Sequence, residues 1–533
     1  MASKDRRAIA AVIACAVGGL WLRVEAARTM GSHLDEGASV LALDQLAAGS
    51  VRLPSGTPYL QGFTLSVLAL PLRWAGSGQI DDLFALRLVS CLVGAAAIVL
   101  VGALTWTLTG RAWCSALAAL LLAIDPTSIQ WSGFFRMYAL LQAMTVAMVL
   151  VTVLVAQHGS SVNRGALLVT LCWAAVFTQI QAAIVVVSLV AGILLLAVRS
   201  ERGARRSLLV VAASMSAAPV VLVLANRVLG GGTSGADAGA GGASFVGGNW
   251  IVVDSWSTRS WSTWWTVVAG GPGGVVVAVA VSVASAILVV HAWRTADLGE
   301  GILLVTHWFG VACVSLLVAS TVPRYVLFVV PMSFAVVAVA GGRATEMIDD
   351  RWSLPPWTGP TAVAVAALGA ALVAVPVRHE HHWSESPDMV FAAREVAKRR
   401  SPGQRTLVTL PPAPGLVLGF DSVLFLSGRV DGDRYRLYTR PGPMGGRTDF
   451  WLGVPVVASS VELCHALLAP EGAWVIAPDK YLADPTWFTP EQREVIDRLT
   501  VDAGGIDYFT RLRRTGGITA ADRARCRALG WRP

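Results

Sequence analysis

Two adjacent carboxylates, Asp35 and Glu36, follow the first hydrophobic stretch of the chain in "SHLDEG", residues 32–37. A carboxylate just outside a membrane can act as a general base and take the proton from an acceptor hydroxyl. The structural alternative is that Asp35 caps the helix predicted from "EGASVLALDQLAAG" and that Glu36 is a first-turn acid favoured by the helix dipole. The two roles are compatible, because capping would also hold the carboxylate in place.

Three arginines, Arg87, Arg136 and Arg324, stand at the ends of hydrophobic stretches. An ionised side chain at membrane depth is costly unless it is paired or hydrated. We expect all three on the side of Asp35 and Glu36, where the positive-inside rule disfavours arginine. The arginine fork matches phosphate geometry, so the set predicts phosphate binding. The alternatives are snorkelling to lipid headgroups and pairing with Asp81, Asp82 or Asp125.

Tyrosines follow two of these arginines, as Tyr138 after Arg136 and Tyr325 after Arg324. A tyrosine hydroxyl is a donor on a rigid apolar body that suits the membrane interface. A lipid-linked phosphate would meet such groups at this depth. His33 and Tyr59 are further candidates for substrate contacts.

One chemistry that needs this set is glycosyl transfer from a polyprenyl-phosphate sugar. The carboxylate would accept the proton of the attacking hydroxyl, and the arginines would stabilise the phosphate that leaves. No nucleotide-binding fold is required, since the donor sugar is already attached to lipid.

The composition is that of a polytopic membrane protein. Of 533 residues, 55% are hydrophobic and 14% are charged, against about a quarter charged in soluble domains. The formal net charge of +8 is interpreted as a topology signal, and a nucleic-acid partner has little support. The first residues could form a signal peptide, but a retained first helix is expected.

About eleven membrane spans are predicted from the hydrophobic runs. They cover 8–27, 82–109, 112–131, 134–156, 165–181, 183–199, 207–227, 265–292, 301–320, 324–341 and 361–377. The shorter run 63–76 is interpreted as interfacial or re-entrant, because counting it as a span would place "RSERGARRS" outside. This topology predicts a cytoplasmic N-terminus.

Two outer loops and an outer domain follow from the topology. The loops are 28–62, with the acidic pair, and 228–264, whose tryptophans suit a membrane interface belt or, alternatively, stacking on sugars. Residues 1–377 would form the membrane domain, and 378–533 an extracytoplasmic α/β domain with strands in "RTLVTL", "WLGVPVVAS" and "GAWVIAP". It contains no GxGxxG or P-loop motif.

Cofactor and disulfide predictions stay open at this stage. No convincing metal-ligand cluster is present, and "HEHHW" (379–383) is either a cation site or, by preference, a polar junction after the last span. A divalent metal therefore has no support. Cys464 and Cys526 of the outer domain could pair in an oxidising compartment.

The chain resembles the GT-C integral-membrane glycosyltransferases, most closely the branch of protein O-mannosyltransferases and lipid A aminoarabinose transferases. The resemblance is carried by the Asp35–Glu36 pair with its following helix, by "DPTSIQWSGFFRMYALL" and by "VPRYVLFVVP". It implies that Asp35 is the catalytic base, that Glu36 is its helper or an acceptor contact, and that the donor is a polyprenyl-phosphate monosaccharide used with inversion. It also implies that Arg136, Tyr138, Arg324 and Tyr325 face the donor phosphate.

The resemblance has departures. No trefoil insert of the eukaryotic protein mannosyltransferase kind is visible, and the outer domain matches in position and α/β character only. The family often has a His-Pro-Pro or Gly-Pro stretch before its second span, where this chain has "SGTPYLQGFTLSVLALP". The enzyme is expected in a bacterial plasma membrane, and its acceptor stays open among a cell-envelope glycan, a glycolipid and a protein.

Two alternatives to a monosaccharide transferase remain. One is an oligosaccharide ligase or polymerase, and the other is a transporter or flippase of lipid-linked glycans. Transporters place ionisable residues near mid-membrane, often with repeats. Here the unusual charges gather at one interface and no repeat is evident, which favours an enzyme.

Overall fold

The computed structural model describes residues 3–532 with gaps. The gaps are 34, 58, 61, 78, 230–274, 318–326, 350–356, 358–360, 362–363, 366–368, 370–387, 431–434, 436–437, 443–445 and 506–509. The predicted loop 228–264 and the last predicted span, 361–377, lie largely in these gaps, as does the predicted domain boundary near residue 377.

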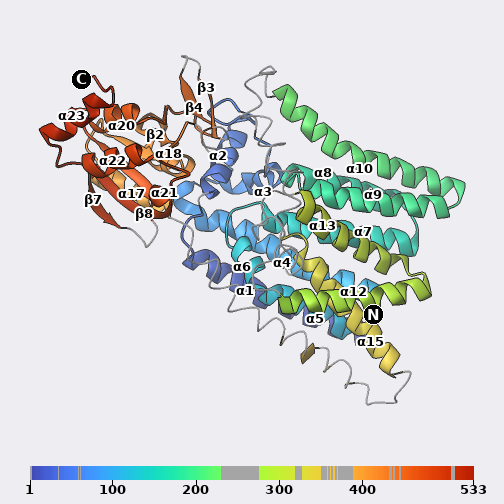
Figure 1. The fold of residues 1–533 in the computed structure, drawn as a ribbon. Helices are drawn as coiled ribbons and strands as arrows, with labels where there is room; N and C mark the ends of the chain where they lie inside the picture. The colour runs from blue at the N-terminus through green and yellow to red at the C-terminus, as the bar shows by residue number, and fades with distance from the viewer. Residues whose placement is uncertain are drawn as a thin grey trace.

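Long apolar helices lie side by side in a bundle, and the α/β domain sits against one end of it (Figure 1). Among the described residues, six helices are long and apolar enough to cross a membrane. These are α1 (Ser3–Thr29), α4 (Leu83–Thr109), α7 (Tyr138–His158), α9 (Ala182–Arg199), α10 (Arg202–Leu229) and α12 (Val275–Thr295). The expectation of a polytopic helical membrane protein is confirmed.

The remaining bundle helices are shorter, bent or more polar. Three are short apolar helices: α3 (Phe63–Trp74), α8 (Val162–Thr178) and α13 (Leu298–Leu317). The helix α15 (Val330–Asp349) packs between α12 and α5 (Ala112–Ile124). The run at 63–76 thus forms a separate helix of 12 residues, which packs against α2 (Glu36–Ala47).

The predicted span 112–131 is not straight. It is bent by 62° between α5 and α6 (Pro126–Ser132). Pro126 disfavours a helical conformation at Asp125, whose carboxylate instead accepts a hydrogen bond of 2.8 Å from the backbone N–H of Ser128. The next predicted span, 134–156, begins only at Tyr138, because a turn precedes α7.

A fully buried arginine of α1 supports this bend. Arg23 donates to the carbonyl oxygens of Leu122 (3.1 Å) and Ala123 (3.2 Å) at the end of α5, and to Ser132 Oγ (3.3 Å). The last carbonyls of a helix lack partners within it and favour a cation nearby. Arg23 therefore stabilises the break, a role that its position in a predicted span does not indicate.

The C-terminal domain is built on a six-stranded sheet with the order β5-β2-β1-β6-β8-β7. Four neighbours pair in parallel: β5 (Val456–Val457), β2 (Val423–Leu426), β1 (Arg405–Val408) and β6 (Ala473–Pro478). The strands β8 (Thr510–Thr515) and β7 (Thr500–Gly505) complete the sheet in antiparallel. β2 and β6 are buried along their whole lengths, as expected for strands covered on both faces.

Helices cover this sheet, and a separate β-ribbon extends beside it. The helices are α17 (Met389–Arg399), α18 (Pro412–Leu418), α20 (Ser460–Leu467), α21 (Asp479–Ala483), α22 (Pro490–Leu499) and α23 (Ala520–Ala528). The ribbon pairs β3 (Thr439–Pro441) with β4 (Arg447–Asp449). The predicted α/β character of the domain is confirmed, although "WLGVPVVAS" supplies only a two-residue strand.

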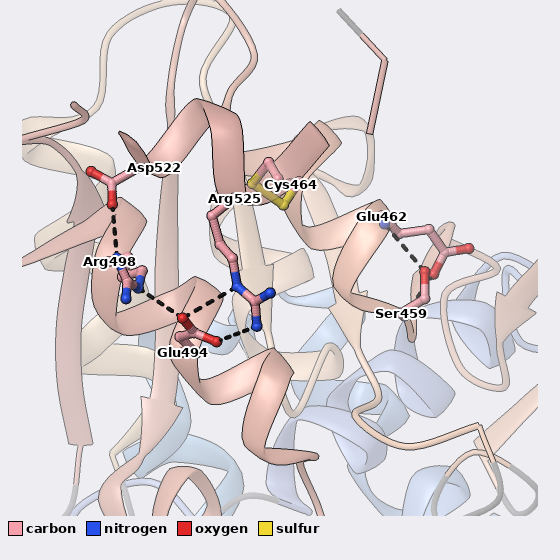
Figure 2. The surroundings of a disulfide bond; sticks show 8 residues. Ser459, Glu462, Cys464, Glu494, Arg498, Asp522 and Arg525 are labelled. Carbon is pink, nitrogen blue, oxygen red and sulfur yellow. Dashed lines mark hydrogen bonds and ion pairs between the residues drawn. A yellow bond between two sulfur atoms is a disulfide. The ribbon is translucent and has the colours of Figure 1, made fainter. Parts of the chain in front are cut away.

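A disulfide joins two of these helices (Figure 2). Cys464 of α20 and Cys526 of α23 are bonded, with their Cα atoms 5.9 Å apart. Beside them, Glu494 accepts from Arg498 (2.9 Å) and Arg525 (2.8 Å), which ties α22 to α23. The structure thus decides the pairing that the sequence left open.

Replacing both cysteines by alanine should destabilise the C-terminal domain. The bond spans a sequence separation of 62 residues, for which the loss of chain entropy in the unfolded state corresponds to roughly 4 kcal/mol. The unfolding temperature of the purified protein should fall in the double variant, and that of the wild-type protein should fall on reduction. Cys15→Ala, which removes a free thiol, should leave the unfolding temperature unchanged. Free thiols at both positions in protein purified without reductant would contradict the pairing.

The C-terminal domain docks on the helix that follows Asp35. Its helix α18 packs against α2, and one buried apolar cluster includes Leu41 and Leu43 of α2 together with Met389 and Phe425 of the domain. We call this end of the bundle the docked end. It comprises α2, the C-terminal turn of α1 and the N-terminal turns of α4 and α7.

Polar contacts fix the same interface. Asp388 accepts a hydrogen bond of 2.6 Å from Ser32, three residues before Asp35, and also caps α17 at Phe391. Arg440 donates to Thr57 (2.8 Å) in the loop after α2. The position of Asp35 is therefore tied to residues that follow it by several hundred positions.

The two domains pack closely at Gly37. A Cβ added there would lie 2.5 Å from the backbone nitrogen of Ala413 and 2.8 Å from its Cα. Gly37→Ala should therefore cost about 1–3 kcal/mol through overpacking, even though alanine favours a helix. Gly301→Ala is the matched control, because its added Cβ meets nothing within 4 Å, and it should leave thermal stability equal or higher. Equal unfolding temperatures for the two variants would contradict this packing.

Candidate active site

The two adjacent carboxylates occupy opposite environments. Glu36 is fully buried and forms a two-pronged ion pair with Arg87 of α4, with Nε–Oε1 at 2.9 Å and Nη2–Oε2 at 2.6 Å. The same carboxylate accepts from the backbone N–H groups of Phe135 and His33, both at 2.8 Å. Glu36 thereby joins the start of α2 to α4 and to the turn before α7.

Arg87 uses all five of its N–H donors inside the protein. Besides its two bonds to Glu36, it donates to the carbonyl oxygens of Ala27 (2.9 Å), Met30 (2.8 Å) and Gly31 (2.7 Å) at the end of α1. A phosphate contact, as expected for Arg87 from the sequence, would require it to break one of these bonds. The geometry favours a positioning role for the Glu36–Arg87 pair.

Asp35 is the more accessible carboxylate. Its side chain is 26% exposed, and its Oδ2 lies 3.6 Å from Arg136 Nη2 and 3.9 Å from His33 Nδ1. It stands at the N-cap position of α2, yet its side chain makes no capping hydrogen bond to the described chain. Helix capping therefore does not account for Asp35.

His33 is held as a neutral acceptor beside Asp35. The backbone N–H of Asp35 donates to His33 Nδ1 at 3.1 Å, which assigns the ring proton to Nε2. The ring packs against Trp131 and Phe134, with centroid distances of 5.2 and 5.1 Å. His33 thus contacts Asp35 on one side and the aromatic rings of Trp131 and Phe134 on the other.

Arg136 connects the candidate base to two tyrosines. Its Nη1 donates to the carbonyl oxygen of Asp35 (2.9 Å) and to Ser39 Oγ (2.8 Å), one turn further along α2. The guanidinium lies 5.7 Å from the centre of the Tyr138 ring and interacts electrostatically with Tyr59. Its Nε is buried without a hydrogen-bond partner in the described chain.

The turn that carries Arg136 depends on a close helix approach. At Gly133, between α6 and α7, an added Cβ would meet the side chain of Met30 and lie 3.3 Å from the backbone nitrogen of Ala27. Glycine there lets the end of α1 contact the turn. Ser39, a member of this site that the sequence analysis did not single out, is four residues after Asp35 and hence on the same helix face.

The structure brings together most of the predicted site residues. Asp35, Arg136, Tyr138, Tyr59 and His33 meet at the docked end. Arg324 and Tyr325 lie outside the described residues, and the chain resumes at Leu327, whose carbonyl accepts from Gln142 of α7 (3.3 Å). Within the described part of the chain, no group of three or more His, Cys, Asp and Glu side chains could hold a metal ion.

The apolar bundle with an α/β domain docked on one end is the architecture of a polytopic membrane protein, and its likeness to solved structures assigns it the GT-C fold. No protein-family model and no curated protein sequence matches the chain. The fold assignment therefore rests on solved structures.

Two proteins among the structural matches are informative. ArnT from Cupriavidus metallidurans, in its crystal structure bound to undecaprenyl phosphate, superimposes with a TM-score of 0.58 over 97% of this chain and 99% of its own, at 14% identity. The archaeal oligosaccharyltransferase AglB from Archaeoglobus fulgidus, in complex with an inhibitory peptide and a dolichol-phosphate, gives a TM-score of 0.56 over 96% of this chain and 74% of its own, at 11% identity. At these identities the likeness establishes the fold.

Proposed function

We propose that this protein is a membrane glycosyltransferase that moves a sugar from a polyprenyl-phosphate donor to an extracytoplasmic acceptor. The observation that carries the proposal is the partly exposed Asp35 carboxylate held beside the buried Arg136 guanidinium at the docked end. The fold shared with ArnT and AglB supports it, because their structures contain undecaprenyl phosphate and dolichol-phosphate respectively.

Asp35 is the general base in this proposal. Its carboxylate takes the proton from an acceptor hydroxyl as that oxygen bonds to the anomeric carbon of the donor. The bond from that carbon to the phosphate oxygen breaks, and the electron pair leaves with the lipid phosphate. Attack from the face opposite the phosphate inverts the anomeric centre.

Arg136 contributes to both ends of this reaction, the catalytic base and the leaving phosphate. Its bonds to the main chain of Asp35 and to Ser39 orient the base, while its charge and the Tyr138 and Tyr59 hydroxyls stabilise the negative charge that grows on the phosphate. Arg324 and Tyr325 complete the phosphate contacts by their resemblance to the family pattern. Glu36 and Arg87 hold this arrangement without contacting substrate.

The proposed setting is a bacterial plasma membrane with a cytoplasmic N-terminus. Arginine-rich connections such as 199–206 then lie inside, and the docked end and the C-terminal domain lie outside, as the positive-inside rule requires. The acceptor is an envelope glycan, a glycolipid or a protein.

The test combines two measurements. Lipid-linked and envelope glycans of a deletion strain should lack one sugar, and the purified protein in lipid nanodiscs should release polyprenyl phosphate from the matching donor when acceptor is present. Movement of an intact lipid-linked glycan across the bilayer, with no change in its sugars, would instead identify a flippase.

A further inference from the structure

The turn between α8 and α9 buries two glutamines whose amide groups have no partners. Gln179 is fully buried and Gln181 is 1% exposed. Neither amide nitrogen and neither amide oxygen has a hydrogen-bond partner in the described chain. Buried polar groups are normally satisfied, because leaving them unpaired costs free energy.

The backbone of this turn does not require these side chains. The N–H of Gln179 donates to Ala175 (2.9 Å), and the carbonyls of Gln179 and Gln181 accept from Ala182 (2.9 Å) and Ile184 (3.0 Å). Neither glutamine side chain caps a helix. Stabilising the turn therefore does not explain why the four amide atoms of Gln179 and Gln181 are buried without partners.

Contacts connect the turn to the candidate active site. Thr178 accepts a hydrogen bond of 2.9 Å from the N–H of Gly62, three residues after Tyr59, which interacts with Arg136. On the other side, the Thr178 hydroxyl lies 3.6 Å from the sulfur of Met144 in α7, the helix that Tyr138 begins. The glutamines thus lie at the same end of the bundle as Asp35.

Two buried side-chain atoms of α7 are also unpaired in the described chain. Thr145 Oγ1, next to Met144, and Gln142 Oε1 are buried and have no partner in the described chain. These groups and the two glutamines are all uncharged. The two glutamines thus form a neutral polar turn at the end of the bundle that also holds Asp35 and Arg136.

The chemistry of these side chains identifies their ligand class. A carboxamide presents two N–H donors and one acceptor oxygen, and each hydroxyl of a sugar can both donate and accept. A phosphate would require cations, which Arg136 supplies, and an ammonium group on the sugar would favour a carboxylate. We propose that Gln179 and Gln181 bind the hydroxyl groups of an uncharged donor sugar and set specificity for it, an inference that rests on the proposed function.

Donor binding at this subsite requires the packing around the turn to open. Both side chains are closed from solvent, and the backbone around Gly62 contacts the turn through its bond to Thr178. A donor sugar reaches the amides when this contact opens, while its phosphate stays beside Arg136.

The experiment uses full-length protein in nanodiscs and a panel of polyprenyl-phosphate mannose, glucose, galactose and arabinofuranose. Gln179→Leu and Gln181→Leu should each lower kcat/KM for the accepted donor roughly tenfold or more, the effect of losing one or two hydrogen bonds to substrate. Binding of undecaprenyl phosphate without a sugar should not change. The matched control is Gln157→Leu near the opposite end of α7, whose amide donates to Thr107, and it should behave as wild type.

A second arm does not depend on the folding of any variant. With the wild-type protein, kcat/KM should fall for donors that lack the hydroxyl contacted by the amides. With the leucine variants, removing that hydroxyl from the donor should lower kcat/KM little further. Wild-type protein that tolerates every deoxy donor, or leucine variants with unchanged kcat/KM, would overturn this inference alone. A wild-type protein inert toward the whole panel would overturn the proposed function, and this inference with it.

Discussion

Replacing Asp35 by asparagine should reduce sugar transfer about 10²- to 10⁴-fold, the range that a positioned general base contributes. Asparagine has nearly the shape of aspartate but cannot accept the proton of the attacking hydroxyl. The contact from Arg136 to the main-chain oxygen of residue 35 does not depend on the side chain, so the site should keep its form. The measurement is the single-turnover rate of polyprenyl phosphate release by purified protein at saturating donor.

The control for this experiment lies on the same helix. Asp44 is a half-buried acid of α2 that pairs with Arg73 at 2.7 Å, away from the Asp35 cluster. Asp44→Asn should leave transfer within a few-fold of wild type, and both variants should unfold near the wild-type temperature. Full activity of Asp35→Asn would remove Asp35 as the base and with it the proposed mechanism.

Replacing Arg87 by methionine should destabilise the protein by about 3–5 kcal/mol, because it leaves the buried Glu36 carboxylate without its cation. The loss also removes the bonds from Arg87 to three carbonyl groups at the end of α1. Thermal unfolding in detergent, followed by size-exclusion chromatography, should show the change as a lower midpoint.

The double variant Arg87→Met/Glu36→Gln separates positioning from phosphate binding. Removing both charges should recover part of the lost stability, since no buried charge then remains unpaired. Arg73 pairs with Asp44 in a less buried setting, so Arg73→Met should cost less than Arg87→Met, about 1 kcal/mol. If Arg87→Met unfolded like wild type yet lost affinity for undecaprenyl phosphate, Arg87 would be a phosphate ligand rather than a positioning residue.

These two predictions assign different work to neighbouring carboxylates. Glu36 has both oxygens occupied by Arg87 and by backbone N–H groups, so it has no capacity left for a substrate proton. Asp35 has a partly exposed carboxylate, whose Oδ2 lies 3.6 Å from Arg136 Nη2. In this dipeptide Glu36 has a structural role and, in the proposed mechanism, Asp35 carries the chemistry.

The sequence by itself determined the membrane-spanning class, the α/β domain at the C-terminus and the neighbourhood of Asp35 and Arg136. Apolar runs long enough to cross a bilayer must form helices, because backbone N–H and C=O groups find no water there. The alternation of buried strands with amphipathic helices similarly predicts a sheet covered by helices. Family-like motifs on one side of the membrane then predicted that Asp35 and Arg136 meet.

Only the tertiary structure decided which polar groups satisfy one another. Arg87 and Glu36 stand 51 positions apart, and the bend after α5 is completed by Arg23, about a hundred positions earlier. The Cys464–Cys526 bond and the unpaired amides of Gln179 and Gln181 are likewise products of packing between helices. The local sequence pattern determines where a helix forms. A buried side chain meets its partner only when distant segments of the chain pack together, and the periodicity of the local sequence does not predict which segments do so.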